Sequence, residues 1–389
     1  MLKYDFNNYC SGCGVCGDAC PVGAIGYDKD KLGFVYPHID IRKCTNCGLC
    51  EKVCPHMNAQ NYREEKEQDV WLFCSSDNEA KMRSASGGAF YELAKATLED
   101  GGYVCGCVWN DSLIARHIVS NSLEDVCRMQ GSKYVQSDVR GCYKKILELL
   151  KAGKKVLFSG TPCQAVAMHS FVTEQYNEKY RAQLLIVGVL CHGVSGPEVW
   201  ESCKRWMEKK KGSKLIGVNF RDKSQEGYKK SYCHYTYANG ESIYLPTYLP
   251  SSKYIEATLV YNLAIRNSCN HCDCKGVNCA CDLIIGDWYA ECTGEGVLGT
   301  SCIVAFTNRG ADMVKTHLTG LREFTYEVIL RENSFIEKSV SRSFKREEFE
   351  NSFDDTVWDN IEKFYPKKYR IKKLFVRLGV FDIIKKIIG

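Results

Sequence analysis

The sequence predicts a chain of the α+β or mixed α/β class, in which a small cysteine-rich domain precedes a larger body built around a mixed sheet. Three observations support this prediction. Cysteine, glycine and proline dominate the first 61 residues. After residue 70, apolar runs of strand length alternate with amphipathic helical patterns. A tyrosine-rich, alternating stretch at 217–245, broken by Asn239-Gly240, is typical of an antiparallel hairpin.

The elements of the body follow from apolar periodicity and strand composition. We expect strands over 70–74, 103–109, 155–158 and 184–190, and helices over 88–99 and 142–151. A chain of 389 residues favours two or three domains. The expected divisions are 1–61, 70–150, 151–310 and a helical C-terminal region at 311–389, with a charged linker over 63–69.

The 24 cysteines bear on the compartment. No apolar segment that could act as a signal peptide follows Met1, so we expect a cytoplasmic protein with reduced thiols. Cysteines in short repeated spacings under reducing conditions more often bind metal than form disulfides. The thiols therefore direct attention to metal sites.

The net charge of +5 is concentrated near the C-terminus. Residues 363–389 carry nine Lys or Arg and one Asp, which leaves a mildly acidic body and argues against a nucleic-acid-binding groove. No apolar run is long enough to cross a bilayer. Apolar residues recur at helical spacing in this tail, at Leu374, Leu378, Phe381, Ile384 and Ile388. The tail either contacts an anionic membrane peripherally or packs on the protein or on a partner subunit.

Two identical cysteine strings occupy the N-terminal domain. Both follow the pattern C-x2-C-x2-C-x3-C-P, the first with Cys10, Cys13, Cys16 and Cys20, the second with Cys44, Cys47, Cys50 and Cys54. In such strings three thiolates hold one 4Fe-4S cluster and the fourth reaches the neighbouring cluster. Crossed ligation therefore predicts one set of Cys10, Cys13, Cys16 and Cys54, and another of Cys44, Cys47, Cys50 and Cys20. The alternative, a pair of structural zinc sites, does not need a third evenly spaced cysteine.

The body offers four further cysteines. Cys163 and Cys191 each follow an apolar strand, and Cys269 and Cys272 form a close pair. Thiols at strand ends lie on rigid elements, so these four could hold a third 4Fe-4S cluster. The alternative is that they are ordinary small buried side chains.

The N-terminal domain resembles the two-cluster bacterial ferredoxins. Across about residues 70–310, the ordered strings from Gly87-Gly88 through Gly160-Thr161-Pro162-Cys163 and Cys191-His192-Gly193 to Gly286-Asp287 resemble the coenzyme F420 hydrogenase/dehydrogenase beta-subunit family. The resemblance implies an FAD-binding body whose 4Fe-4S cluster is held by Cys163, Cys191, Cys269 and Cys272. It also implies that three segments line the flavin, with Ser86, Gly87, Gly88, Lys133, Tyr134, Gly286 and Asp287 as the candidate contacts.

Physical roles can be assigned to some of these residues. Amides beside Gly87 and Gly88, at a helix start, would suit the FAD pyrophosphate. Lys133 could place positive charge near the flavin, or be a solvated surface lysine. Asp287 either bonds to the cofactor or simply ends a strand. No side chain is assigned a catalytic role.

Some features depart from the family pattern or remain uncommitted. Asp287 continues into Trp288-Tyr289-Ala290 in place of an aromatic residue and a glycine. Three extra cysteines, Cys274, Cys279 and Cys281, could replace ligands or be plain thiols. A G-x-G-x-x-G string at 294–299 precedes a predicted strand, not a helix, and is therefore interpreted as a loop. His192 and His271 adjoin proposed ligands, although structural roles are the simpler interpretation.

These observations predict an iron-sulfur flavoprotein that passes electrons between a ferredoxin or partner subunit and a small-molecule redox substrate, with coenzyme F420 as the carrier that the resemblance implies. One alternative is a ferredoxin-dependent reductase of an organic substrate, such as a pigment or a glycan precursor. Another is a metal-stabilised binding module without turnover.

Overall fold

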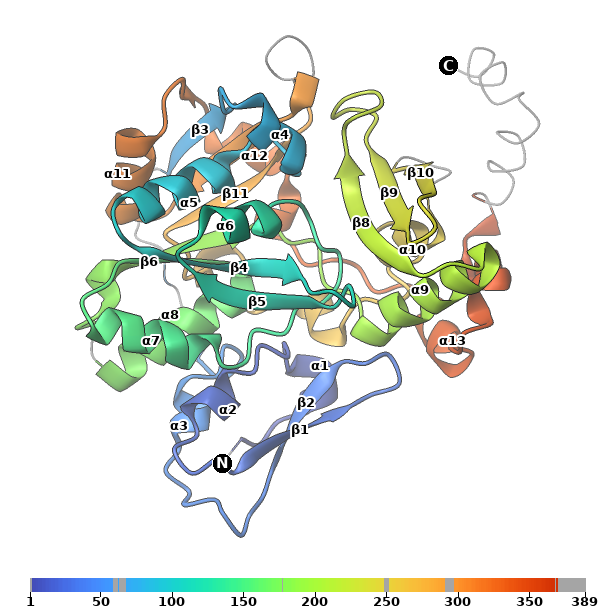
Figure 1. Cartoon of the computed structure of the whole chain (residues 1–389). Helices are drawn as coiled ribbons and strands as arrows, with labels where there is room; N and C mark the ends of the chain where they lie inside the picture. The colour runs from blue at the N-terminus through green and yellow to red at the C-terminus, as the bar shows by residue number, and fades with distance from the viewer. Residues whose placement is uncertain are drawn as a thin grey trace.

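The computed structural model describes residues 2–58, 62, 68–176, 178–247, 252–290, 297–367 and 369. The linker predicted at 63–69 lies largely outside them, as does the tail helix predicted near the C-terminus. The described strands form sheets of two, three and eight strands (Figure 1). None of the helices in this part of the chain combines the length and apolar character that a membrane span requires.

Residues 2–58 form an N-terminal module that lies against one end of the body (Figure 1). Its elements are α1 (Phe6–Tyr9), α2 (Val15–Ala19), β1 (Ile25–Lys29), β2 (Val35–Ile39) and α3 (Leu49–Lys52). β1 and β2 pair antiparallel. Gly14 and Gly48, which precede α2 and α3, have nearly equal φ values of 76° and 77°. Because few residues other than glycine adopt this conformation, the two cysteine strings share one local backbone design.

The large sheet has the order β13-β3-β12-β11-β7-β6-β4-β5. Its strands are β3 (Asp69–Phe73), β4 (Tyr103–Trp109), β5 (Ala115–Ser120), β6 (Val156–Gly160), β7 (Leu184–Val189), β11 (Leu283–Trp288), β12 (Thr300–Ala305) and β13 (Arg322–Glu323). β4, β6, β7 and β11 run parallel, whereas β5, β12 and β13 pair antiparallel with their neighbours. The mixed sheet confirms the predicted fold class.

Helices cover both faces of this sheet (Figure 1). One face packs against α4 (Asn78–Arg83), α5 (Ala89–Glu99), α6 (Leu123–Met129) and α11 (Asn308–His317). The other packs against α7 (Cys142–Lys151), α8 (Pro162–Tyr176) and α12 (Tyr326–Glu332). Alternate residues of β3 enter opposite cores, with Leu72 on one face and Trp71 on the other, as the period of a strand requires. The boundary predicted at 150/151 falls within the last turn of α7, which belongs with β6 to this layered unit.

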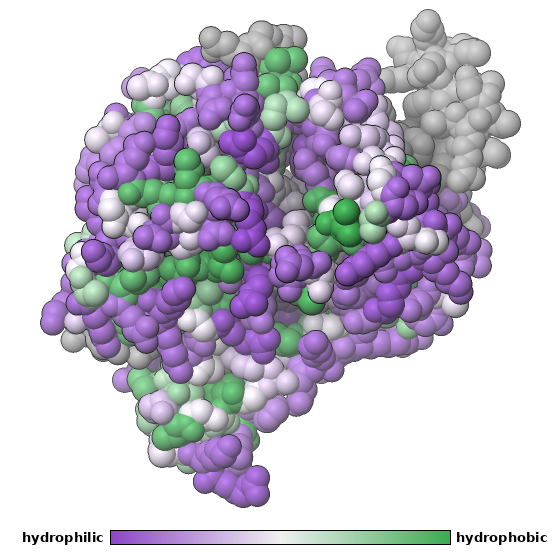
Figure 2. Space-filling model, viewed as in Figure 1, coloured by the Kyte–Doolittle hydropathy of each residue, from purple (hydrophilic) through white to green (hydrophobic). Residues whose placement is uncertain are grey.

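A second core lies beside the large sheet. It contains β8 (Leu215–Asp222), β9 (Tyr232–Tyr237) and β10 (Ser242–Pro246), with α9 (Pro197–Lys211), α10 (Lys253–Ile255) and α13 (Arg346–Asn351) nearby. The hairpin predicted at Asn239-Gly240 is confirmed between β9 and β10. Figure 2 shows a recess between this part and the part that carries the large sheet, on a face covered mostly by hydrophilic side chains.

Candidate functional site

Two groups of four thiols each line a small cavity in the N-terminal module. The first group, called the proximal set, is Cys10, Cys13, Cys16 and Cys54. The second group, the distal set, is Cys20, Cys44, Cys47 and Cys50. Each set takes three thiols from one string and the fourth from the other. This is the grouping that crossed ligation predicts, and ligation itself stays a prediction.

The surroundings of these thiols suit sulfur that carries negative charge. Backbone N–H groups donate to three of the sulfurs, from Gly12 to Cys10 at 3.3 Å, from Asn46 to Cys44 at 3.4 Å and from Ala24 to Cys20 at 3.2 Å. Such bonds tune an iron-sulfur cluster. Burial raises the pKa of the Cys16 thiol to about 12. A buried thiol of this kind loses its proton when a metal takes the proton's place.

A third group of four thiols, the body set, lies at the ends of two parallel strands. Cys191 follows β7, and Cys163 lies in the first turn of α8 after β6. Cys269 and Cys272 come from a short 3-10 turn and its C-terminal end. All four line one cavity, and burial raises the pKa of Cys163 to about 11, with the charge of Cys272 adding to it. A hydrogen bond from the neighbouring Cys274 thiol lowers the pKa of Cys272 to about 7.

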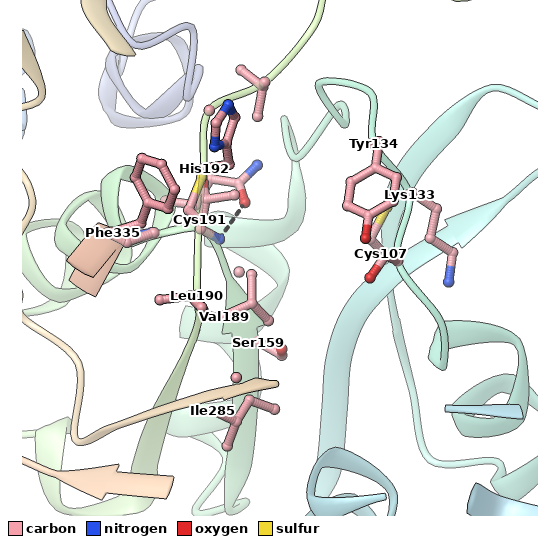
Figure 3. A pocket seen from close by; sticks show the side chains of 18 of the residues that line it. Cys107, Lys133, Tyr134, Ser159, Val189, Leu190, Cys191, His192, Ile285 and Phe335 are labelled. Carbon is pink, nitrogen blue, oxygen red and sulfur yellow. Dashed lines mark hydrogen bonds between the residues drawn. The ribbon is translucent and has the colours of Figure 1, made fainter. Parts of the chain in front are cut away.

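This cavity has a volume of about 550 Å³ and follows the carboxyl-terminal halves of β4, β6, β7 and β11. In open α/β sheets, ligands bind at the carboxyl ends of the parallel strands. Figure 3 shows Cys191 and His192 on one wall, with Cys107 and Tyr134 on the opposite wall. The volume lies within the range of cofactor and small-molecule sites. The body set therefore opens into a space that could hold an organic cofactor.

Six of the seven residues named for the flavin line this same cavity: Ser86, Gly88, Lys133, Tyr134, Gly286 and Asp287. The seventh, Gly87, is packed behind the wall. Its N–H donates to the Ser301 hydroxyl at 3.0 Å, and a Cβ there would lie 2.4 Å from the Phe73 carbonyl oxygen. The Gly87 amide is thus engaged inside the protein, and its expected role at a pyrophosphate stays a prediction. Gly88, with φ of 94°, forms the N-cap of α5 and keeps its place at the cavity.

Lys133 is not a solvated surface residue, because its amine is bound within the chain. The amine donates to the carbonyls of Arg128, Met129, Gln130 and Gly131 at 2.7–3.1 Å, at the C-terminal end of α6. Figure 3 shows the amine turned away from the wall that carries Cys191. Burial lowers the pKa of Lys133 to about 8. The side chain stabilises a helix end, where a cation interacts favourably with the helix dipole.

Asp287 belongs to a polar group at the cavity. Its carboxylate accepts hydrogen bonds from Arg221 at 3.3 Å and from the Tyr289 hydroxyl at 3.0 Å. Arg221 also donates to the Tyr289 oxygen at 3.0 Å and lies over the Tyr228 ring at 5.0 Å. Asp287 lies within β11, so it does not end the strand.

Sequence reasoning missed two residues whose buried nitrogens have no hydrogen-bond partner among the described residues. These atoms are Nδ1 of His117 and Nε of Arg221, and both residues line the cavity. Nε2 of His117 bonds to the Ser159 carbonyl at 3.0 Å. An unpaired acceptor and an unpaired donor in one cavity fit a polar ligand. No sequence signal could have found them, because each is a single polar residue in a strand.

The residues to which the sequence assigned no definite role are bonded to other residues or are buried. His192 bonds to the Asn262 side chain at 2.8 Å, and His271 bonds to the Asn8 carbonyl at 2.9 Å. Cys274, Cys279 and Cys281 are buried, and Cys274 lines the cavity beside Cys272. The first half of the G-x-G-x-x-G string, at 294–296, lies outside the described residues, and β12 follows the string, as the predicted strand requires. In the described part of the chain, no three His, Cys, Asp or Glu side chains are placed to hold a single metal ion.

Direct hydrogen bonds join the proximal set to the body. The Tyr143 hydroxyl donates to the Cys13 carbonyl at 3.1 Å, and Gln136 donates to the Ser11 carbonyl at 2.9 Å. Ser11 and His56 of the N-terminal module also line the large cavity. The proximal set therefore faces the body set, whereas the distal set, with the exposed Cys47, lies farther out.

Comparisons with known proteins match two parts of the chain to known families. Residues 153–323 match the family described as the C terminus of the coenzyme F420 hydrogenase/dehydrogenase beta subunit, and residues 9–58 match the 4Fe-4S dicluster domain. Residues 153–323 are thus similar to the C-terminal part of this beta subunit. A chain in a solved structure of the F420-reducing [NiFe] hydrogenase complex from Methanosarcina barkeri is 17% identical, with a TM-score of 0.47, over 71% of this chain and 91% of that chain. No curated protein matches.

Together, the two matched domains indicate what kind of protein this chain is. It is an iron-sulfur electron-transfer oxidoreductase. The match over residues 9–58 confirms the expected N-terminal 4Fe-4S domain.

Proposed function

We propose that this beta-subunit relative passes electrons between 4Fe-4S clusters and FAD, with coenzyme F420 or a similar two-electron carrier as its substrate. One observation carries the proposal. The body set and six of the residues named for the flavin line a single cavity, and residues beside the proximal set line it too. A flavin accepts electrons singly and releases them as a pair, which would link one-electron clusters to a two-electron carrier.

Three thiol sets would hold the clusters. The proximal and distal sets each surround a cavity in the N-terminal module, and the body set lies at the ends of β6 and β7. Their order along the molecule supports transfer between the exposed distal end and the buried cavity. An external ferredoxin or a partner subunit would then meet the protein at Cys47, which is the exposed thiol of the distal set.

The chain's own residues would hold and shield the flavin. Gly88 places the N-terminus of α5 at the cavity, where backbone N–H groups attract a pyrophosphate. Nδ1 of His117 and Nε of Arg221, which have no partner in the described part of the chain, would provide an acceptor and a donor for a heterocyclic ring. Asp287 and Tyr289 fix the Arg221 guanidinium in place. Tyr134 forms part of the cavity wall opposite Cys191 (Figure 3).

Anaerobic purification followed by iron, sulfide and flavin quantitation tests the proposal. We expect about twelve irons, from roughly three cubanes, and one FAD per chain. Cys13→Ser and Cys269→Ser should each remove the EPR signal of one cluster. Cys127→Ser, a half-buried thiol outside the three sets, is the matched control and should leave all signals unchanged. Protein free of flavin and acid-labile sulfide would contradict the proposal.

The substrate is tested separately by mixing the reduced, flavin-loaded protein with coenzyme F420. Rapid reoxidation of the flavin, with reduction of the added carrier, supports the deazaflavin as substrate. A flavin that stays reduced with F420, yet is reoxidised by an organic acceptor, would favour a substrate reductase instead.

A further inference from the structure

Arg266 lies between the N-terminal module and the body with its side chain completely buried. Its guanidinium makes three hydrogen bonds. Nε donates to the Cys10 carbonyl at 2.6 Å, while the two terminal nitrogens donate to the Gln136 side-chain oxygen and to the Val35 carbonyl, both at 2.9 Å. All three acceptors are neutral.

The positive charge of Arg266 has no carboxylate ion-pair partner among the residues that the structure describes. The guanidinium also lies over the rings of Phe34 and Tyr36, at 5.1 and 4.5 Å. Asp30 is engaged elsewhere, by the N–H groups of the following turn and by the Tyr36 hydroxyl. A buried ion without a counter-charge costs several kcal/mol. Retention of this cation therefore calls for negative charge nearby.

The guanidinium lies close to both thiol sets at the junction. It donates to the carbonyl of Cys10, and a Cβ at Gly12 would lie 2.6 Å from one of its terminal nitrogens, so it lies against the loop of the proximal set. On the body side, Arg266 lies in the turn that carries Cys269, whose N–H donates to the Arg266 carbonyl at 3.0 Å. Arg266 thus lies between two groups of candidate ligands.

Lys275 is a second buried cation, and it lies beside the body set alone. It is 7% exposed, and its amine donates to the carbonyls of Cys191 and Lys338 at 2.7 and 2.9 Å. Lys275 lines the same cavity as Cys191 and Cys272 of the body set. In the described part of the chain this cation, too, forms no ion pair with a carboxylate.

From this geometry we infer that the counter-charges of these two cations are iron-sulfur clusters, with Arg266 shared by the proximal and body clusters and Lys275 serving the body cluster alone. The inference rests on the proposed function. When an external one-electron donor reduces a cluster, no bond forms or breaks, and the cluster becomes more negative by one charge. A nearby buried cation stabilises that reduced form and raises its reduction potential.

The consequence is a gradient in the ease of reduction along the three clusters. The body cluster adjoins two cations and the proximal cluster adjoins one, while the hydrogen bonds that the two side chains make within the described residues include none to the distal set. Arg266 and Lys275 would therefore make reduction progressively easier from the exposed distal end toward the cavity. They are positioning residues in this sense, since they act on the clusters through their charge.

EPR-monitored redox titration of the full-length, cluster-loaded protein tests the inference. Arg266→Gln should lower the midpoint potentials of two clusters, each by a tenfold change in the ratio of oxidised to reduced cluster, or about 59 mV for one electron. Lys275→Gln should lower only one of these two. Arg266→Lys keeps the charge and should stay close to the wild type. Arg205→Gln, which removes an exposed arginine paired with Asp355, is the control and should shift none.

The outcomes separate this inference from the proposed function. Arg266→Gln protein with full iron content and unchanged potentials would overturn the inference while leaving the proposed function intact. Wild-type protein without clusters would instead refute the proposed function. If Arg266→Gln does not fold, Lys275→Gln decides, because a fall in the potential of one cluster supports the inference and no change overturns it.

Discussion

Single buried side chains determine how the region of the cavity responds to a change of pH. His117 is 4% exposed, its ring stacks on Phe158 at 5.9 Å, and its Nε2 bonds to a backbone carbonyl. Burial lowers the pKa of His117 to about 4, so the imidazole stays neutral at physiological pH. Such a residue links the stability of the whole chain to pH.

We expect the His117→Phe variant to lose less stability on acidification than the wild type. As pH falls from about 6.5 toward 4, the unfolded chain binds a proton at this histidine and the folded chain does not. The wild type therefore loses up to about 1.4 kcal/mol per pH unit in this window through this residue alone. Melting temperatures at pH 7 and pH 5.5 measure the difference. His38→Phe, at an exposed site, is the control, and an equal acid sensitivity in His117→Phe would contradict the expectation.

At the scale of elements, one helix of the body is capped by a residue of the N-terminal module. α7 begins after Gly141, which has a φ of 83° and no side chain that could act as a cap. The Asp18 carboxylate, from α2 of the N-terminal module, accepts the Gly141 N–H at 2.9 Å. An acidic group at a helix N-terminus satisfies free N–H groups and interacts favourably with the dipole. The module therefore completes a helix of the body.

Asp18→Ala should destabilise the protein by about 1 kcal/mol, the usual cost of losing an N-cap. The loss should also loosen the attachment of the module, because the cap bridges the two parts. Thermal melting measures the first effect, and limited proteolysis between the module and the body measures the second. Asp28→Ala, which removes an exposed carboxylate of the same module, should change neither. Equal effects of the two variants would show that Asp18 has no special role.

For the whole molecule, the decisive feature is the order of the thiol sets from surface to interior. The distal set contains the exposed Cys47 with the half-buried Cys44 and Cys50. The proximal set is buried and is bonded to the body through the Cys10 and Cys13 carbonyls. Access of solvent and of partners therefore decreases along the same line as the proposed electron path.

Graded oxidation with ferricyanide should consequently destroy the cluster at the distal set first. An exposed cluster meets the oxidant directly, whereas the other two are shielded by the module and by the walls of the cavity. Parallel measurement of iron release and of the EPR signals gives the order of loss. Disappearance of the body signal before the distal signal would contradict this order.

The local chemistry was readable from the sequence because it depends on short spacings. Three thiols with two residues between neighbours, and a fourth before proline, form their pattern within a few turns of backbone, and the dicluster domain was predicted on that ground. The strands and helices of the mixed sheet were predictable for a similar reason, since the alternation of Trp71 and Leu72 between two cores is imposed by the strand period. The spacing also predicted the grouping of the eight thiols into crossed sets.

Only the tertiary structure decided which distant residues meet. Arg266 contacts Cys10 across 256 residues of chain, and Asp18 caps a helix 123 residues away. Packing around one cavity leaves a nitrogen of His117 and one of Arg221 without a partner among the residues that the structure describes. Lys133 and Gly87 lie in segments that the sequence assigned to the flavin, yet packing engages the Lys133 amine and the Gly87 N–H in hydrogen bonds within the protein. Contacts of this kind depend on how complete layers pack together, and a lone polar residue in a strand or turn carries no local signal of its final partner.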